Sequence, residues 1–436
     1  MIHFKEKNLT KLFLRFALPS ILGLILVSFQ LIIDGIFVSV AVGPFGLAAI
    51  TLSSPLINIL LSVSLMIICG GVVIAGIAKG SGDEELSKGY SSLTLLVFTI
   101  TMFTLSALIL SNIDFFINLL GANSELKPYV RQYLSVMVGG VFFYCFPILT
   151  EGFARLINRP KLVFLSGFVS VALNVLFDYI FVIRFNLGLT GAGCATCLAS
   201  GCAAFTLLPF LKFGKIRGDF SNVKRIFFNG SSEMLTSVSS AITTNIFNIV
   251  LLKYIGTLGV SALTIVMYIN ILVNYTMFGI AQALQPLVAY NLGAKKLGVI
   301  KKLLSISLSI GGVVGVLVYL LVLVFRKEVI GVFTRDNAEL FNIAMVATTY
   351  ISIHYLFSFV NIILGSFHTA IEKPIESALI GLGRSIVFVA LPLILLPKFL
   401  GPLGIWISPA IAEFLCLLVS IPLTWNSIKK IRLTLG

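Results

Sequence analysis

Long apolar segments recur along the whole chain and constrain its fold more than any other feature of the sequence. A helix needs about 20 apolar residues to cross the hydrocarbon core of a membrane, and twelve segments of the 436-residue chain reach this length. They lie at 13–40, 47–78, 91–119, 130–157, 161–183, 189–213, 227–255, 257–291, 302–325, 340–370, 374–397 and 403–426. A mean hydropathy of +1.07 with only 11% charged residues excludes a water-soluble domain of this size. The sequence therefore predicts an all-α integral membrane protein with twelve transmembrane helices.

The basic residues predict how these spans are oriented. If the spans alternate in direction, 23 of the 31 lysines and arginines fall on the side of the N-terminus and 8 on the other side. Because such an excess marks the cytoplasmic side, we expect a multi-pass protein of the plasma (inner) membrane with both termini cytoplasmic. The net charge of +14 lies in short loops beside the spans. This placement favours contact with anionic phospholipids at the cytoplasmic face and argues against nucleic acid as a partner.

The two halves of the sequence repeat one another. The run GPFGLAAIT that begins at Gly43 recurs 213 residues later as GTLGVSALT from Gly256. Since each half contains six spans, both halves insert the same way round, and we expect a pseudo-twofold axis along the membrane normal to relate them. We therefore predict an N-terminal lobe at 1–213, a cytoplasmic linker at 214–226 and a C-terminal lobe at 227–436.

Two carboxylates lie well inside predicted spans of the first half. Asp34 is about six residues from the outer end of the first span, and Asp178 is about five from the outer end of the fifth, so both lie at one depth. Asn174 lies one turn from Asp178 on the same helix face, and Thr196 has a similar depth in the sixth span. Charged side chains in a membrane are costly and are usually retained for function. These four residues form an oxygen-only set that suits Na⁺ or a shared proton better than zinc or copper, and the two cations would compete.

The repeat makes this candidate site asymmetric. The positions 213 residues after Asp34 and Asp178 are Phe247 and Leu391, so an ion site of this kind belongs to the N-terminal half alone. The alternative is that both aspartates are structural and are satisfied by hydrogen bonds, for example from Gln30 or Thr190.

Other polar residues in the spans complete the candidate list. Glu413, near the middle of the twelfth span, is either a titrating, cation-attracting group of a substrate cavity or a packed carboxyl group. Gln30, Gln285 and Asn245 are further candidates for such a cavity. Pro19 removes a backbone hydrogen bond from the first span and predicts either a moving or a static kink.

The sequence shows no pattern of residues that is typical of an enzyme active site. No nucleophile with a base and oxyanion donors is visible, nor any glycine-rich phosphate-binding loop, so we expect neither an enzyme nor a cofactor beyond a coupling ion. The pair Cys194 and Cys197 has a C-x-x-C spacing but lies in a Gly/Ala-rich apolar run, where it more plausibly supplies small packing residues than a metal site.

The motifs, taken in order, resemble the multidrug and toxic compound extrusion (MATE) family. They are IDGIF around Asp34, Asn174-x-x-x-Asp178, the glycine-rich run 188–196 that ends at Thr196, and AQALQPLVAYNLGA at 281–294. The run NGSSE from Asn229 is most similar to a bacterial branch of small multidrug exporters. The resemblance implies a monomeric, cation-coupled antiporter that exports amphipathic, often cationic drugs by alternating access. It also implies that Asp34, Asn174, Asp178 and Thr196 bind Na⁺ or H⁺ and that Pro19 takes part in conformational change.

One residue departs from the pattern, and one other function remains open. Other branches of the family carry an acidic residue deep in the seventh helix, whereas Glu233 lies at the start of that span, which argues against an ion site in the second half. The alternative function is a flippase of related fold for lipid-linked saccharides. Such a flippase would favour a basic cavity, but Arg384 is the main basic residue inside a predicted span.

Overall fold

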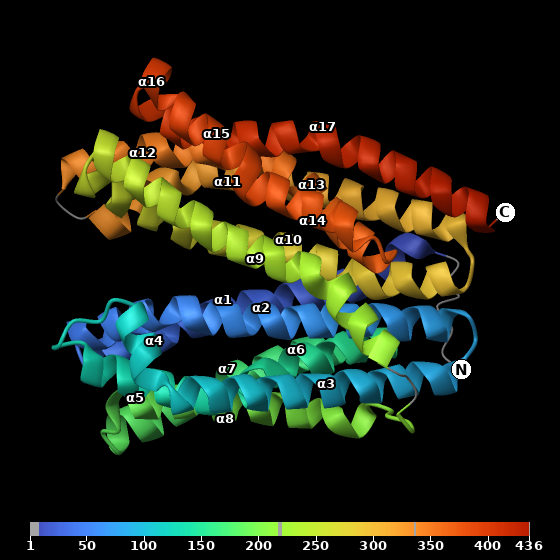
Figure 1. The fold of residues 1–436 in the computed structure, drawn as a ribbon. Helices are drawn as coiled ribbons and strands as arrows, with labels where there is room; N and C mark the ends of the chain where they lie inside the picture. Colours follow the sequence, from blue (N-terminus) through green and yellow to red (C-terminus); the bar gives the residue numbers. More distant parts are fainter. Residues whose placement is uncertain (1–7, 217–219, 335–336, 436) are drawn as a thin grey trace. The chain divides into compact units, whose positions relative to one another are not determined.

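The computed structural model describes residues 8–216, 220–334 and 337–435, and the regular structure in these ranges is helical (Figure 1). Eleven helices in these ranges are long and apolar enough to cross a membrane. Two shorter helices, α5 (Lys127–Gly139) and α6 (Val141–Leu156), are bent by 44° against each other and supply a twelfth span if counted together. The predicted all-α architecture with twelve transmembrane segments is confirmed.

The chain divides into two compact units, and the first contains the described residues of Leu14–Gly230. Besides α5 and α6, its helices are α1 (Leu9–Ala41), α2 (Pro44–Gly80), α3 (Glu84–Ser111), α4 (Ile113–Leu119), α7 (Lys161–Asp178), the π-helical turn η1 (Tyr179–Arg184), α8 (Gly188–Leu207) and the 3-10 turn η2 (Leu208–Phe210). Small residues let α8 pass close to the bend between α5 and α6. A side chain added at Gly140 would overlap that of Cys197, which shows that Cys197 is a packing residue there.

The second unit contains the described residues of Ser231–Gly436, together with Asn8–Phe13. Its helices are α9 (Phe220–Tyr254), α10 (Thr257–Gly293), α11 (Leu297–Thr334), α12 (Ala338–Ile351), η3 (Ser352–His354), α13 (Tyr355–Ala370), α14 (Pro374–Leu382), the π-helical turn η4 (Gly383–Val387), α15 (Phe388–Leu395), α16 (Pro397–Leu400) and α17 (Pro402–Leu435). The division falls inside α9, because this helix begins at Phe220. Residues 220–226 of the expected linker are therefore helical, and the basic Lys224 and Arg225 belong to the first turns of a long helix.

Backbone turns recur at the repeat spacing. Gly43 and Gly256 have φ angles of 79° and 82°, and each precedes a helix of 37 residues, α2 and α10. Gly188 and Gly401 also share the left-handed conformation, with φ angles of 54° and 59°. Glycine adopts this region without the steric cost that other residues incur. The two halves thus use the same turns at the same places.

Two π-helical turns break this symmetry. In the first unit η1 follows Asp178 directly, and in the second unit η4 contains Arg384. Adding the repeat spacing of 213 to η1 leads to residues 392–397, which lie beyond η4. π-Helical turns occur frequently at functional sites because they change the direction in which neighbouring side chains point. Both turns lie beside the polar residues described next.

Candidate cation site and a second polar cluster

The acidic cluster of the first unit is built by three helices. Asp34 comes from α1, Asn174 and Asp178 from the last two turns of α7, and Thr196 from α8. The Thr196 hydroxyl lies 3.5 Å from Asp34 Oδ2 and donates a shorter hydrogen bond, of 3.0 Å, to the carbonyl of Ala192. A hydroxyl has a single proton to donate, so it can serve only one of these two acceptors at a time. The structure thus brings together the four residues that the sequence proposed.

Polar atoms in this cluster lack hydrogen-bond partners. Asn174 and Asp178 have 0% exposed surface, and Thr196 has 8%. Both carboxylate oxygens of Asp178, both side-chain polar atoms of Asn174 and Oδ1 of Asp34 are buried without a hydrogen bond. Asp34 nevertheless lies close enough to Asp178 and Asn174 for side-chain hydrogen bonds with both. Since nearly all buried polar atoms in proteins are satisfied, this arrangement fits residues that hold a cation or a proton.

The two example partners of a purely structural role do not bond Asp178. Gln30 accepts a hydrogen bond from Ser170 at 3.3 Å, and Asp178 receives none from either Gln30 or Thr190. Asp178 is therefore not held in place by either of these residues.

Close contact between α1 and α7 explains why the two aspartates meet. A Cβ atom added at Gly167 of α7 would lie 3.2 Å from Cα of Gly23 in α1, so these glycines allow the backbones to approach. Asp34 follows Gly23 by eleven residues, and Asp178 follows Gly167 by eleven residues. Because eleven residues make about three helical turns, each aspartate lies on the same helix face as its glycine. The equal spacing is a sequence signal that could have predicted the pair.

Tyr133 of α5 lies near the cluster, and sequence reasoning missed it. Its phenol is half-buried and lies within electrostatic range of both Asp34 and Asp178. A phenol can donate a hydrogen bond to a carboxylate or supply an oxygen to a cation. A single tyrosine within an apolar span gave no signal that would distinguish it from an interfacial aromatic residue.

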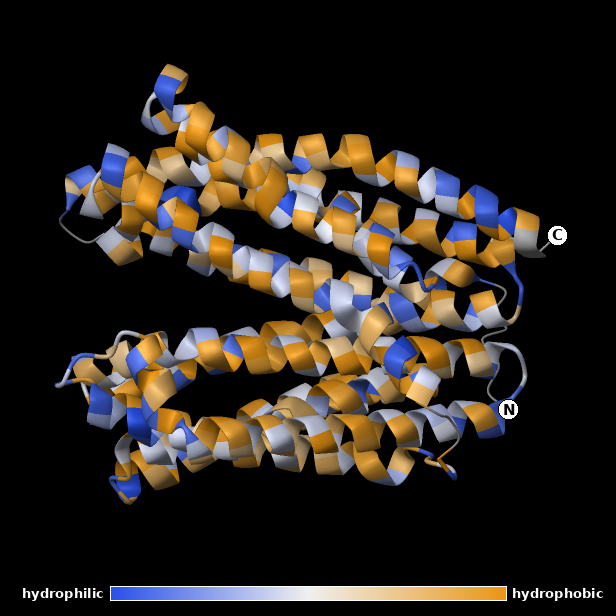
Figure 2. Cartoon of the chain, viewed as in Figure 1, coloured by the Kyte–Doolittle hydropathy of each residue, from blue (hydrophilic) through white to orange (hydrophobic). Residues whose placement is uncertain are grey.

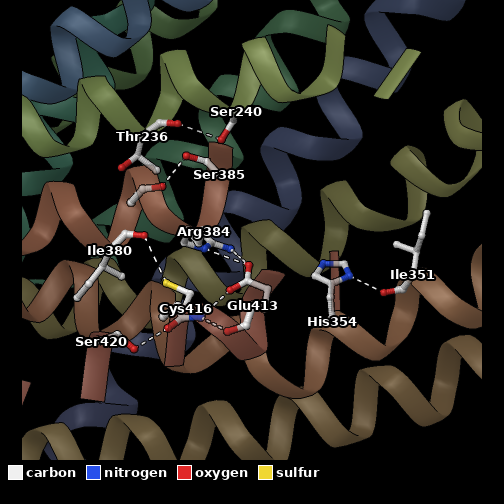
Figure 3. A network of polar contacts seen from close by, with 12 residues as sticks. Thr236, Ser240, Ile351, His354, Ile380, Arg384, Ser385, Glu413, Cys416 and Ser420 are labelled. Carbon is white, nitrogen blue, oxygen red and sulfur yellow. Dashed lines mark hydrogen bonds and ion pairs between the residues drawn. The ribbon is translucent and has the colours of Figure 1, made fainter. Parts of the chain in front are cut away.

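A second polar cluster lies in the other unit and is fully paired (Figure 3). Arg384 Nη2 and Nε donate to Glu413 Oε1 at 2.7 Å and 3.1 Å. The amide of Asn361 in α13 donates to Glu413 Oε2 at 2.7 Å, and Ser420 donates to Asn361 Oδ1 at 2.7 Å. Both carboxylate oxygens of the buried Glu413 are therefore satisfied, and the guanidinium offsets its charge.

This cluster gives Glu413 a partner that the sequence did not identify. Its carboxyl group forms an ion pair with Arg384. Arg384 follows Pro374 by ten residues inside a 27-residue span, as the sequence predicted. Its cost in the membrane is reduced by the ion pair.

The remaining candidate residues lie in separate settings. Gln285 of α10 donates to Glu233 of α9 at 3.1 Å, so Glu233 is bound within its own unit. Asn245 is exposed on α9 and donates to the carbonyl of Ala241 at 3.1 Å. Pro19 lies inside α1, which continues through it from Leu9 to Ala41. The three candidates of the second unit, Gln285, Asn245 and Glu413, thus have separate hydrogen-bond partners.

Comparison with known proteins agrees with this architecture. The MatE family model matches residues 19–180 and 233–394, two segments separated by nearly the repeat spacing. The chain is 24% identical over 435 residues to the multidrug export protein MepA of Staphylococcus aureus, with 96% of this chain and 94% of the relative covered. It is 22% identical over 438 residues to MepA of Staphylococcus saprophyticus, with the same coverage.

Solved structures share the fold at low sequence identity. An outward-facing multidrug resistance MATE family transporter of the MOP superfamily superposes with a TM-score of 0.92, at 20% identity over 98% of this chain and 97% of the other. A MOP superfamily transporter from Pyrococcus furiosus, whose reversed pocket polarity was taken to suggest a different function, gives the same values. The fold and sequence define a multi-pass transporter of the plasma membrane. The chain belongs to the MatE family, that is, to the MATE transporters.

Proposed function

We propose that this transporter is a cation-coupled antiporter that exports amphipathic, often cationic organic compounds by alternating access. Na⁺ or H⁺ is the coupling ion, and Asp34, Asn174, Asp178 and Thr196 bind it. The observation that carries the proposal is the set of buried, unpartnered polar atoms on Asp34, Asn174 and Asp178. A cation would supply the partner that these atoms lack.

The donor set favours a hard monovalent cation or a proton. Two carboxylates, an amide and a hydroxyl present oxygen atoms, and no thiol or imidazole group belongs to the cluster. Two carboxylates that lie close together in an apolar region repel each other when both are ionised. Either a Na⁺ ion or a proton relieves that repulsion, so the two ions compete for one site.

Ion binding can drive export only through a difference in affinity between two conformations. We propose that the cation binds more tightly when the site is reached from outside and that its binding favours release of the organic compound there. By thermodynamic reciprocity the organic compound then weakens cation binding by the same factor. Pro19, which lies four turns before Asp34 on α1, is the proposed point of helix bending.

The substrate class rests on the relatives, which are named multidrug export proteins. A flippase for lipid-linked saccharides would need basic groups free to bind phosphate. In this chain the intramembrane Arg384 forms an ion pair with Glu413 and is therefore not free to bind a phosphate group. This pairing favours organic cations over lipid-linked saccharides as the substrate. We further propose that both termini are cytoplasmic, on the basis of the charge count.

Gradient-driven efflux of a fluorescent organic cation from vesicles tests the proposal. Asp34→Asn and Asp178→Asn are each expected to abolish the dependence of efflux on imposed Na⁺ or pH gradients. Asp114→Asn is the matched control, because Asp114 is an exposed carboxylate of the same unit that pairs with Arg131. Wild-type gradient dependence in both cluster variants would refute the assignment. Applying the two gradients separately identifies the coupling ion.

A further inference from the structure

An apolar groove runs between α11 and α17, and α13 forms its floor. Its volume is about 520 Å³, and it is open along one side of the second unit. The residues that line it are Leu304, Leu308, Ser309, Phe359, Val360, Leu364, Ile421, Thr424, Trp425 and Ile428. Besides the indole of Trp425, the polar groups of this lining are the hydroxyls of Ser309 and Thr424, and the Thr424 hydroxyl donates to the carbonyl of Ser420. A groove of this size and polarity fits a hydrocarbon chain.

The groove lies near one end of the unit. Leu304 follows the first residue of α11 by seven positions, and Ile428 precedes the last residue of α17 by seven positions. At about 1.5 Å per residue, the groove reaches to within about 10 Å of these helix ends. An acyl chain in the groove would therefore place its headgroup at the ends of α11 and α17.

Lysine side chains stand at that end. Lys301 is exposed on α11 and lies one turn before Leu304 on the same helix face. Lys429 is exposed on α17, with its ammonium group 5.6 Å from the ring centre of Trp425. Figure 2 shows hydrophilic residues gathered along the last turns of α17. Of the two carboxylates at the junction of α13 and α14, Glu372 lies in the turn, and Glu376 lies in the first turn of α14 and pairs with Lys373.

The two tryptophans of the chain have opposite environments. Trp406 is 1% exposed, whereas Trp425 is 61% exposed and lines the groove. Exposed tryptophan is typical of the depth at which headgroups meet acyl chains. Trp425 therefore lies where the junction between the headgroup and the chain of a bound lipid is expected.

We propose that this groove is a binding site for an anionic phospholipid. One acyl chain lies in the groove on α13, and the phosphate contacts Lys301 of α11 and Lys429 of α17. The basic rim selects an anionic headgroup over a zwitterionic one, because each lysine near the headgroup adds a favourable charge interaction. The site lies within one unit, shares no residue with the acidic cluster and does not depend on the proposed function.

Quenching of Trp425 fluorescence by brominated lipids tests the proposal in vesicles of the full chain. The probes are phosphatidylglycerol and phosphatidylcholine with brominated acyl chains, each added at low mole fraction to unlabelled phosphatidylcholine. Brominated phosphatidylglycerol is expected to quench at lower mole fraction than brominated phosphatidylcholine and to reach saturation. The Trp425→Phe variant supplies the signal of Trp406 for subtraction.

Variants distinguish lipid binding in the groove from a general attraction of anionic lipids to basic residues. Lys301→Gln and Lys429→Gln are each expected to weaken the preference for phosphatidylglycerol by about fivefold. Lys295→Gln with Lys296→Gln is the control, because these exposed lysines lie between α10 and α11, outside the groove lining. Ser309→Phe should abolish saturable quenching without changing charge, and unfolding temperatures verify that each variant is folded.

Three results would overturn the proposal. One is equal quenching by the two lipids, and another is an equal loss of preference in the control and groove variants. The third is displacement of the quenching lipid by an organic-cation substrate or by a second copy of the chain, which would make that molecule the occupant instead.

Discussion

The two buried acidic regions of this transporter differ in how their charge is balanced. In the first unit Asp34 and Asp178 lie close together, and among the described residues their interaction partners are carboxyl, amide and hydroxyl groups. In the second unit Glu413 receives two hydrogen bonds from Arg384 and one to its other oxygen from Asn361. The charge of a buried carboxylate that is paired with an arginine is already balanced, so the carboxylate gains little from binding a further cation. The difference underlies our proposal that the first region exchanges ions, whereas the ion pair of the second links two helices.

The largest expected effect comes from breaking the permanent pair. Arg384→Gln leaves the buried Glu413 charge uncompensated, and loss of one partner of a buried ion pair typically costs about 3–5 kcal/mol of stability. We expect a marked fall in the thermal unfolding temperature of the purified protein. Adding Glu413→Gln to this variant should recover most of the loss, because the amide no longer carries the charge. An unchanged unfolding temperature in Arg384→Gln would show that the pair contributes nothing.

The next effect concerns the exchangeable ion. If Na⁺ binds the first cluster, adding it at 100 times its Kd should stabilise the wild-type protein by about 2.7 kcal/mol. The stabilisation should vanish in Asp178→Asn and persist in the double variant Arg384→Gln/Glu413→Gln. Lowering the pH until the carboxylates are protonated should remove it, because protons and Na⁺ compete. Unfolding temperatures across a Na⁺ titration at two pH values give the measurement, and a Na⁺ effect that survives Asp178→Asn would place the ion elsewhere.

A smaller effect should follow from separating α1 and α7. A methyl group at Gly167 would meet Cα of Gly23 at 3.2 Å, so Gly167→Ala should push the helices apart and weaken cation binding by about tenfold, or about 1.4 kcal/mol. Gly35→Ala is the control next to Asp34, because its added methyl group meets nothing within 4 Å. Equal cation affinity in both variants would contradict the role of the Gly23–Gly167 contact.

The smallest effect is expected at Thr196. Its hydroxyl lies 3.5 Å from Asp34, so Thr196→Ala removes one neutral oxygen and should reduce cation affinity by about fivefold, as expected for a loss of about 1 kcal/mol. Thr196→Ser keeps the hydroxyl and should restore most of the affinity. If serine fails to restore binding, the methyl group rather than the hydroxyl contributes at this position.

The comparison also shows what the sequence could predict. The lengths of the apolar segments predicted the twelve spans. The position of a residue within its span gives its depth in the membrane, and the equal depth of Asp34, Asp178 and Thr196 predicted that they lie together. The sequence places both Arg384 and Glu413 inside spans but does not indicate that they pair, because the partners are 29 residues apart on different helices. The expected linker at 214–226 overlaps α9, which begins at Phe220. The sequence did not predict this overlap, because the helix extends beyond its apolar segment into polar, basic residues.

Efflux of a fluorescent organic cation under imposed Na⁺ and pH gradients tests the difference between the two regions most directly. Asp178→Asn is compared with the charge-balanced double variant Arg384→Gln/Glu413→Gln in vesicles of matched protein content. We predict that Asp178→Asn loses the response to both gradients, whereas the double variant keeps the response of the wild type. Gradient-dependent efflux in Asp178→Asn together with its loss in the double variant would assign ion coupling to the second unit and contradict this account.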